Sequence, residues 1–399
     1  MAGYLLAPPE TSELDTRGCL SKETCKSIDH MLLDDLGKRI RRFYVPSGFP
    51  TGTDPNNKWR VVSCLQKAIR HGNTEMAQMS ASVLYDLDQS YLFRRLAVIA
   101  VEDVGAGSVY SMLSSLAVAG NSAWRKSVDG RRLGVWMAKQ QARAPKDRTL
   151  CDMLVVVDYE PDLPKAEWAQ LPTGDLLAHV DDVGLDFEYR MMAAWLAAGS
   201  AKYRGMSMPE DNYRDAGLLF RHMVERGHSR MALYLAAKIA GRLNEAMWVS
   251  TLFFDDWLRQ TAGAGFDISS LKLKLPPTPK VGQLLGAAYD MYTREGKIAI
   301  GKFRKENADV LDPFLKSVPT NMSSTLLSYG IFQVEGGAQG NRAVFANSEP
   351  LESRAKVVEM AYTGIDPGLL PEFRQVLLDN IDALNECRAK VLYATRSGS

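Results

Sequence analysis

The polar residues best suited to chemistry lie between Ala288 and Arg304. Asp290, Arg294 and Lys297 follow one another at i, i+4 and i+7, a spacing that places three side chains on one face of a helix. The two cations could hold phosphates, and the carboxylate could act as a general base or stabilise a cationic sugar. The same spacing occurs in surface helices whose ion pairs only stabilise the helix, so both interpretations stay open.

Neighbouring residues could complete such a site. Tyr289 and Tyr292 could stack on an exposed base, and Lys302 and Arg304 extend the positive end of the segment. Glu335 is a second candidate carboxylate, beside two glycines that a catalytic loop or a tight hairpin turn would explain equally well. A carboxylate near a sugar, a pocket for a flipped base and a basic cradle are what base excision needs.

Three blocks earlier in the chain resemble a known family. They read CLQKAIRHGNTEMA from Cys64, LFRRLAVIAVEDVG from Leu92 and AKQQARAPK from Ala138. In this order and spacing they resemble the helical region that follows the ATPase module in the RarA (MgsA) replication-recombination family. That family includes the Werner-helicase-interacting proteins and is related to clamp loaders. The resemblance covers residues 59–154, about a quarter of the chain.

The resemblance implies a role on DNA, near replication or repair, with cations of these helices placed along a nucleic-acid strand. The cations concerned are Lys67, Arg70, Arg94 and Lys146. For the charges of the second block, an internal salt-bridge network is the alternative. A fainter similarity to bacterial antiviral DNA glycosylases attaches to no single motif.

ATP chemistry does not follow from the resemblance. The chain has no G-x-x-x-x-G-K-[ST] loop to cradle phosphates and no G-x-G-x-x-G dinucleotide fingerprint. The residues before position 59 are too few for an ATPase domain. We therefore expect no nucleotide and no other cofactor.

Composition limits the remaining classes. Hydrophobic residues make up 46% of 399, enough for a sizeable core, and a net charge of +1 means that DNA contact must come from a local patch. Five scattered Cys and five isolated His favour a reducing cytoplasm and no structural metal. We expect no secretion signal and no membrane span, because the N-terminus lacks a basic start and no long apolar run exists.

Periodicity predicts a mainly α fold, either a multi-helix bundle or an array of helical hairpins. One helix should begin at Ser21, its N-cap. Polar breaks at 71–73 and 86–88 should separate further helices, and another should run over 281–305. At most one small β-hairpin is expected, over 329–346 in the C-terminal third.

Composition shifts divide the chain into five parts. They are an N-terminal tail and helix at 1–57, a RarA-like helical domain at 58–157, a linker at 158–184, a second helical domain at 185–265 and a C-terminal domain at 266–399 with the site helix and the hairpin. The last part lies beyond the resembling region.

These observations predict an ATP-independent, DNA-acting enzyme. We expect a glycosylase that flips out a damaged or modified base and uses Asp290 and Glu335 as its carboxylates. DNA is the expected partner, and homo-oligomer formation stays open. The alternative is a non-catalytic scaffold of the replication-recombination machinery that binds DNA or assembles into oligomers.

Overall fold

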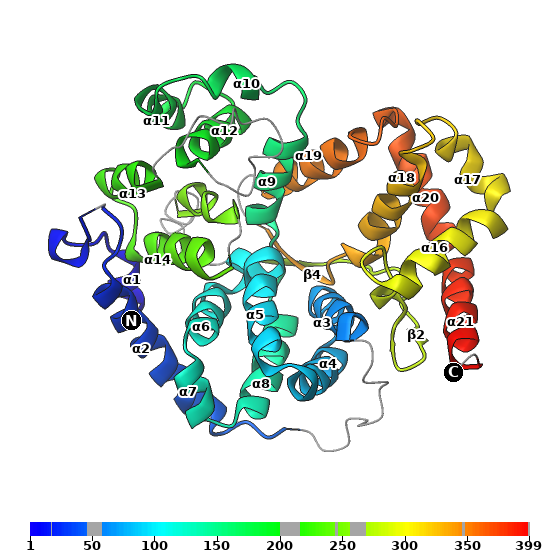
Figure 1. The fold of residues 1–399 in the computed structure, drawn as a ribbon, viewed down its shortest axis with the longest axis horizontal. Helices are drawn as coiled ribbons and strands as arrows, with labels where there is room; N and C mark the ends of the chain where they lie inside the picture. Colours follow the sequence, from blue (N-terminus) through cyan, green and yellow to red (C-terminus); the bar gives the residue numbers. More distant parts are fainter. Residues whose placement is uncertain are drawn as a thin grey trace.

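The computed structural model describes residues 1–16, 18–45, 58–199, 216–243, 246–255, 269–344 and 348–397. The prediction of a mainly α fold is confirmed, because helices dominate these residues and the strands form two small antiparallel sheets of two strands each (Figure 1). The expected domain boundaries at 57 and 265 lie outside the described residues.

The described residues of the N-terminal half are mostly helical. The helices are α1 (Ala2–Leu6), α2 (Lys22–Ile40), α3 (Lys58–His71), α4 (Thr74–Leu87), α5 (Gln89–Ile99), α6 (Val109–Gly120), α7 (Ser122–Ser127), α8 (Gly130–Arg143) and α9 (Thr149–Tyr159). A short π-helix, η2 (Ala100–Val104), continues α5.

Local capping signals set several of these boundaries. Ser21 caps α2, Asn73 caps α4 and Asp88 caps α5, in each case by accepting the backbone N–H three residues ahead. Gly72 turns the chain ahead of α4 with a φ of 76°. The predicted start at Ser21 and both predicted helix breaks are therefore confirmed.

Helices continue through the middle of the chain and into its C-terminal part. The middle helices are α10 (Lys165–Trp168), α11 (Thr173–Asp181), α12 (Phe187–Ala198), α13 (Ala216–Glu225) and α14 (Arg230–Lys238). The C-terminal helices are α16 (Arg294–Glu306), α17 (Ala308–Leu315), α18 (Ser323–Ile331), η8 (Phe332–Gly336), α19 (Ser348–Ala361), α20 (Leu370–Asp379) and α21 (Ile381–Ser397). The segment expected to be a linker thus contains α10 and α11.

Two predictions in the C-terminal part are wrong. The helix expected over 281–305 begins only at Arg294, after a tiny hairpin of β2 (Lys280–Val281) and β3 (Leu284–Leu285). The hairpin expected over 329–346 does not form, because its first arm lies in α18 and η8. Its second arm, β4 (Asn341–Val344), pairs instead with the distant strand β1 (Ser269–Lys272).

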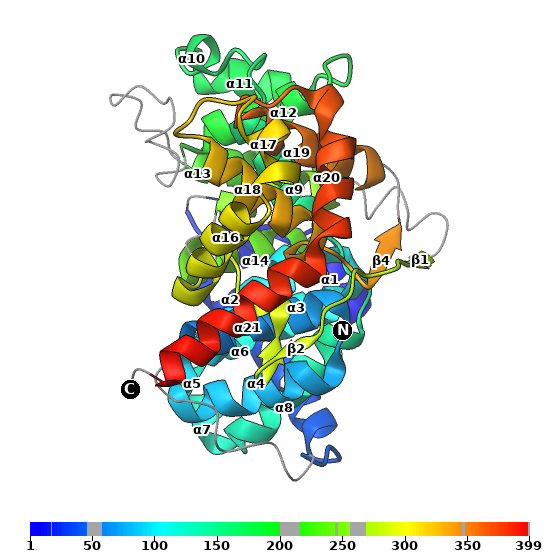
Figure 2. The ribbon, with the colours of Figure 1, turned by 90° about the vertical axis from the view of Figure 1, so that its right-hand side faces the viewer.

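The described residues pack around two hydrophobic cores. The larger core joins the helices from α2 to α14, and the smaller one lies among α16, α17, α18, α20 and α21. α19 contributes Val358 to the first core and Met360 to the second. α19 also packs along α9, so these two helices lie where the parts built around the two cores meet (Figures 1 and 2).

The helical stretch Gln89–Gly120 is long and apolar enough to cross a membrane by composition alone, but 72% of its most apolar window is buried inside the protein. Such burial is usual in the core helices of soluble proteins. The stretch therefore lies within the larger hydrophobic core.

Candidate active site

Asp290 lies in the turn before α16. Thr293 caps the helix by accepting a backbone N–H at 3.1 Å, so the helix begins after Asp290. The predicted helix face shared by Asp290, Arg294 and Lys297 is therefore wrong, and the two cations are exposed on α16. The Asp290 carboxylate instead forms a buried ion pair with Lys67 of α3.

Gly296 is required by the same turn. A Cβ at this position would lie 2.0 Å from the backbone oxygen of Asp290 and 2.4 Å from its nitrogen. At Gly296 the group that approaches the helix so closely is the chain's own turn. Gly301, one and a half turns later, has no such constraint, because a Cβ there would meet nothing within 4 Å.

Replacing each of these glycines with alanine should have opposite effects. Gly296→Ala should lower the free energy of unfolding by about 1–3 kcal/mol, because the Asp290 turn must move away from the new methyl group. Gly301→Ala should raise it by up to about 1 kcal/mol, because alanine favours the helix. Urea unfolding of both variants checks the pair, and equal shifts would show that the turn does not pack on Gly296.

Glu335 is also buried and paired. Both of its carboxylate oxygens accept hydrogen bonds from Arg388 of α21, at 3.0 and 2.7 Å. Its backbone oxygen lies 2.9 Å from His71 Nε2. Burial lowers the pKa of His71 to about 4, so the neutral ring donates through Nε2. Both carboxylates expected from the sequence are therefore joined to buried cations.

The resembling blocks meet at Asp103, in the π-helix η2. Its carboxylate accepts hydrogen bonds from Gln66 (3.0 Å), Arg70 (2.8 Å) and Arg148 (2.6 Å). Burial would raise the pKa of Asp103, but the two guanidinium groups hold it well below its usual value. The internal salt-bridge network considered for the second block is thus present, and it fixes Arg148 at the start of α9.

The expected phosphate-binding cations divide by exposure. Lys67, Arg70 and Lys146 are buried, and the Lys146 ammonium donates to backbone oxygens at the end of α8. A second group of these cations is exposed or half-buried on the surface: Arg94, Arg294, Lys297, Lys302 and Arg304. Lys302 pairs with Glu306 at 2.6 Å. Only this second group can meet a phosphate without rearrangement of the fold.

The two candidate stacking residues also differ. Tyr289 is 4% exposed, and its hydroxyl donates to the backbone oxygen of Val281 at 3.3 Å. Tyr292 is 66% exposed and lies edge-on to Phe332, with ring centroids 6.3 Å apart. Tyr292 is therefore the one of the two whose ring is open to a ligand.

A pocket opens beside this network, between α9, η8 and α19. The side chains that line it are Arg148, Asp152, Val155, Phe332, Gln333, Gly337, Gln339, Glu352, Ala355, Lys356 and Glu359. Charged and amide groups surround a small apolar area of Phe332, Val155 and Ala355. None of the carboxylates expected from the sequence lines it.

Asp152 is the most unusual group in the pocket. It is 7% exposed, and no side chain of the described residues donates a hydrogen bond to its carboxyl group. Burial raises its pKa to about 7, although Arg148 opposes the shift. A carboxyl group in this state holds its proton about half of the time near neutral pH, as an acid-base catalyst requires.

Two further carboxyl groups lie close by. Burial raises the pKa of Glu359, while Gln333 Nε2 donates to its carboxylate at 2.9 Å and opposes the shift. Burial also raises the pKa of Glu102, next to Asp103. Asp152, Glu352 and Glu359 thus line one pocket, and the charge of Glu352 adds to the rise of the pKa of Asp152.

A buried amide adds a recognition element. Gln339 is 5% exposed, and its amide oxygen has no hydrogen-bond partner within the described part of the chain. An unpaired buried polar atom costs free energy, so it indicates a place where a ligand would supply the partner. The pocket therefore combines acid-base groups with the Gln339 amide, which can form a hydrogen bond to a polar atom of a ligand.

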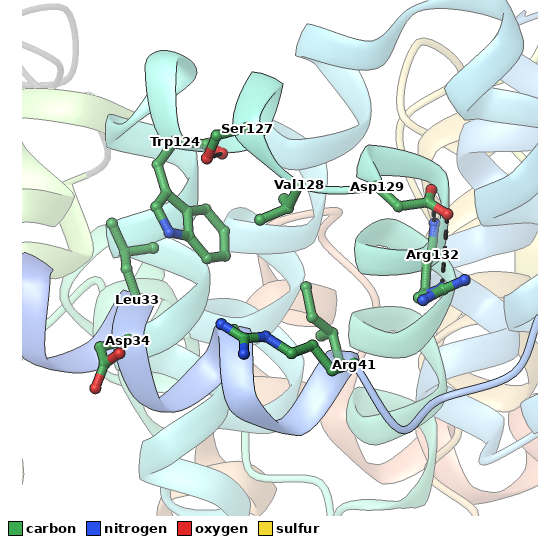
Figure 3. A pocket seen from close by; sticks show the side chains of 10 residues that line it. Leu33, Asp34, Arg41, Trp124, Ser127, Val128, Asp129 and Arg132 are labelled. Carbon is green, nitrogen blue, oxygen red and sulfur yellow. Dashed lines mark hydrogen bonds and ion pairs between the residues drawn. The ribbon is translucent and has the colours of Figure 1, made fainter.

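A second hollow lies on another face, between α2, α7 and α8 (Figure 3). The Trp124 ring faces Leu33 and Val128 there, and Arg132 is turned toward Asp129, 3.5 Å away. We assign no chemistry to this hollow.

Among the residues that the structure describes, no group of three or more His, Cys, Asp or Glu side chains is placed to hold a metal ion. Comparisons with protein-family models, with curated proteins and with solved structures found no match to this chain.

Proposed function

We propose that this chain is a DNA-acting, ATP-independent hydrolase of the cytoplasm that cleaves the N-glycosidic bond of a damaged or modified base. The observation that supports it most is Asp152, a buried carboxyl group with a pKa of about 7 in a pocket lined by two further carboxyl groups, Glu352 and Glu359, and an aromatic ring. The DNA part rests on the resemblance of residues 59–154 and on the exposed cations.

Asp152 and Glu359 take complementary roles in this proposal. Protonated Asp152 gives its proton to the leaving base as the C1′–N bond breaks. Glu359, whose carboxyl group accepts a hydrogen bond from Gln333, takes a proton from the attacking water and stabilises the positive charge that develops on the sugar. Water adds to C1′ and the base leaves as the neutral molecule, so protons balance over the cycle.

Other groups would hold the substrate. The cavity has a volume of only about 40 Å³, so Phe332 and the side chains around it must move apart before a flipped base can stack on the ring and bond to the Gln339 amide. Arg148 and Lys356 lie at the pocket and can bind a flanking phosphate. Asp290 and Glu335 do not contact the substrate in this proposal. Their buried ion pairs fix α3, α16 and α21 around the pocket.

The test is excision without ATP. Labelled oligonucleotides carrying unmodified, deaminated, alkylated, oxidised or glycosylated bases are incubated with the protein and then treated with alkali, which breaks the strand at abasic sites. We expect breaks at one class of base, and Asp152→Asn should slow their formation about 100- to 10,000-fold.

Asp158→Asn is the matched control for this test. Asp158 lies on the same helix, and burial raises its pKa to about 6, but it does not line the pocket. Its variant should cut within about twofold of the unchanged protein. Binding without breaks on every substrate would leave the non-catalytic scaffold, and equal loss in both variants would mean that the pocket is not the site.

A further inference from the structure

An aromatic platform lies on the surface at the start of α3. Trp59 is 57% exposed and meets Tyr91 of α5 edge-on, with centroids 5.6 Å apart. The Lys58 ammonium lies 4.1 Å from the Tyr91 ring and 5.5 Å from the Trp59 ring. Burying a tryptophan is normally favourable, so an indole held open beside a cation indicates a partner with both a ring and a negative charge.

Cations surround this platform. Arg94 is exposed one helical turn after Tyr91, and Arg294 and Lys297 are exposed on α16. Arg60 of α3 pairs at 2.6 Å with Glu295 and so joins the start of α3 to α16. The acids of this surface are occupied, since Glu295 faces Arg60 and Asp88 pairs with Lys58 at 2.6 Å. These pairs also neutralise Lys58 and Arg60, so the exposed positive charge comes from Arg94, Arg294 and Lys297.

A chain of polar contacts, buried at Gln66 and Asp103, runs beneath the surface from α5 toward the pocket. Arg95, one turn after Tyr91, donates to Gln66, and Gln66 donates to Glu102 at 3.0 Å. Gln66 also reaches Asp103, which holds Arg148 at the pocket. From Tyr91 to Glu102 the helix advances about 16 Å at 1.5 Å per residue.

We infer that the surface from Trp59 and Tyr91 to the Asp152 pocket is a track for single-stranded DNA, with one base stacked on Trp59 and another, a few nucleotides away, in the pocket. The inference rests on the proposed function for the identity of the pocket, but the binding itself does not require excision. Exposed rings take unpaired bases, which a duplex keeps stacked inside.

The test uses a short labelled thymidine oligomer, as a single strand and annealed to its complement, with fluorescence anisotropy at low and physiological salt. The unchanged protein should bind the single strand more tightly than the duplex, and the affinity should fall as salt rises. Trp59→Ala should weaken single-strand binding about 5- to 150-fold, the usual value of one base stacked on an aromatic side chain.

Two variants make the result specific. Trp59→Phe keeps a ring and should retain most of the affinity, and Tyr44→Ala, which removes another exposed aromatic side chain, should bind as the unchanged protein does. Thermal melting shows whether each variant is folded. The track is rejected if folded Trp59→Ala binds the single strand normally, or if the duplex binds equally well.

The result separates the two proposals. Asp158→Asn should keep its single-strand affinity, because Asp158 lines neither the platform nor the pocket. If Trp59→Ala loses affinity while no substrate is cut, the track stands and the glycosylase assignment falls. If substrates are cut and Trp59→Ala binds normally, the glycosylase assignment stands and the track falls.

Discussion

The Asp152→Asn variant should be more stable than the unchanged protein at about pH 8, by an amount on the order of 2–4 kcal/mol. The pKa of Asp152 rises from 3.8 in a free side chain to about 7 in the folded protein, because burial penalises its charge. The asparagine amide has a similar shape and carries no charge, so it avoids this penalty at every pH.

The sign of the pH dependence follows from proton binding. Between about pH 4 and 7 the folded protein keeps the Asp152 proton while the unfolded chain has released it, so the unfolded state binds fewer protons and stability falls as pH rises. The stability gap between variant and unchanged protein should widen by up to about 1.4 kcal/mol per pH unit in this window. Above about pH 7 the gap should stay constant.

Urea unfolding at several pH values between 5 and 8.5 measures the gap directly. Asp158→Asn serves again as the control, since its carboxyl group is less buried and its pKa rises only to about 6. Its gap should be smaller and should level off about one pH unit earlier. A gap for Asp152→Asn that is absent or reversed at pH 8 would mean that the folded protein stabilises the charged carboxylate.

A variant that is more stable but inactive would mark Asp152 as a residue kept for chemistry. Buried charge without a partner is a cost to folding, and proteins retain such a cost mainly at functional sites. A purely structural carboxylate would give the opposite result, as the buried pairs of Asp290 and Glu335 should.

Much of the fold could be predicted from the sequence because its signals are local. Ser21, Asn73 and Asp88 bond to backbone three residues away, so their roles can be read within one turn of chain. The start of α16 carried the same kind of signal in Thr293, but the apparent helical spacing of Asp290 and its neighbours concealed it. Periodicity alone does not locate a helix end.

The site could not be predicted in the same way, because its partners come from distant parts of the chain. Lys67 meets Asp290 across 223 residues of chain, and Glu335 meets Arg388 across 53, so neither pair can be read from a local pattern. The sequence does contain one sign of Asp152, because it is the single charged residue in the apolar run TLCDMLVVV. Its neighbour Glu359 comes from α19, and no sequence pattern connects the two.

Asp103→Asn should be the most destabilising of the substitutions considered, lowering the free energy of unfolding by about 3–5 kcal/mol at neutral pH. The carboxylate is fully buried and neutralises Arg70 and Arg148, so its removal leaves buried positive charge without a partner. Asp86→Asn is the control, because its ion pair with Arg131 is on the surface, with Asp86 55% exposed, and should contribute at most about 1 kcal/mol.

The pH dependence of this effect should be opposite to that of Asp152. The pKa of Asp103 is lowered in the folded protein, so its stabilisation is complete above the free value of 3.8 and is lost as pH falls below it. The gap between Asp103→Asn and the unchanged protein should therefore be constant from about pH 5 to 8 and should shrink only in stronger acid. A gap that grows with rising pH would contradict the assignment of Asp103 as a permanently ionised anchor.

Asp103→Asn should also change the proposed chemistry through Arg148. Without its partner, the Arg148 guanidinium interacts more strongly with Asp152 and lowers the pKa of that carboxyl group. If Asp152 gives its proton to the leaving base, excision by the folded variant should decline at a lower pH than excision by the unchanged protein. Loss of rate without a shift in this pH profile would show that Asp103 supports the fold but does not set the proton affinity of Asp152.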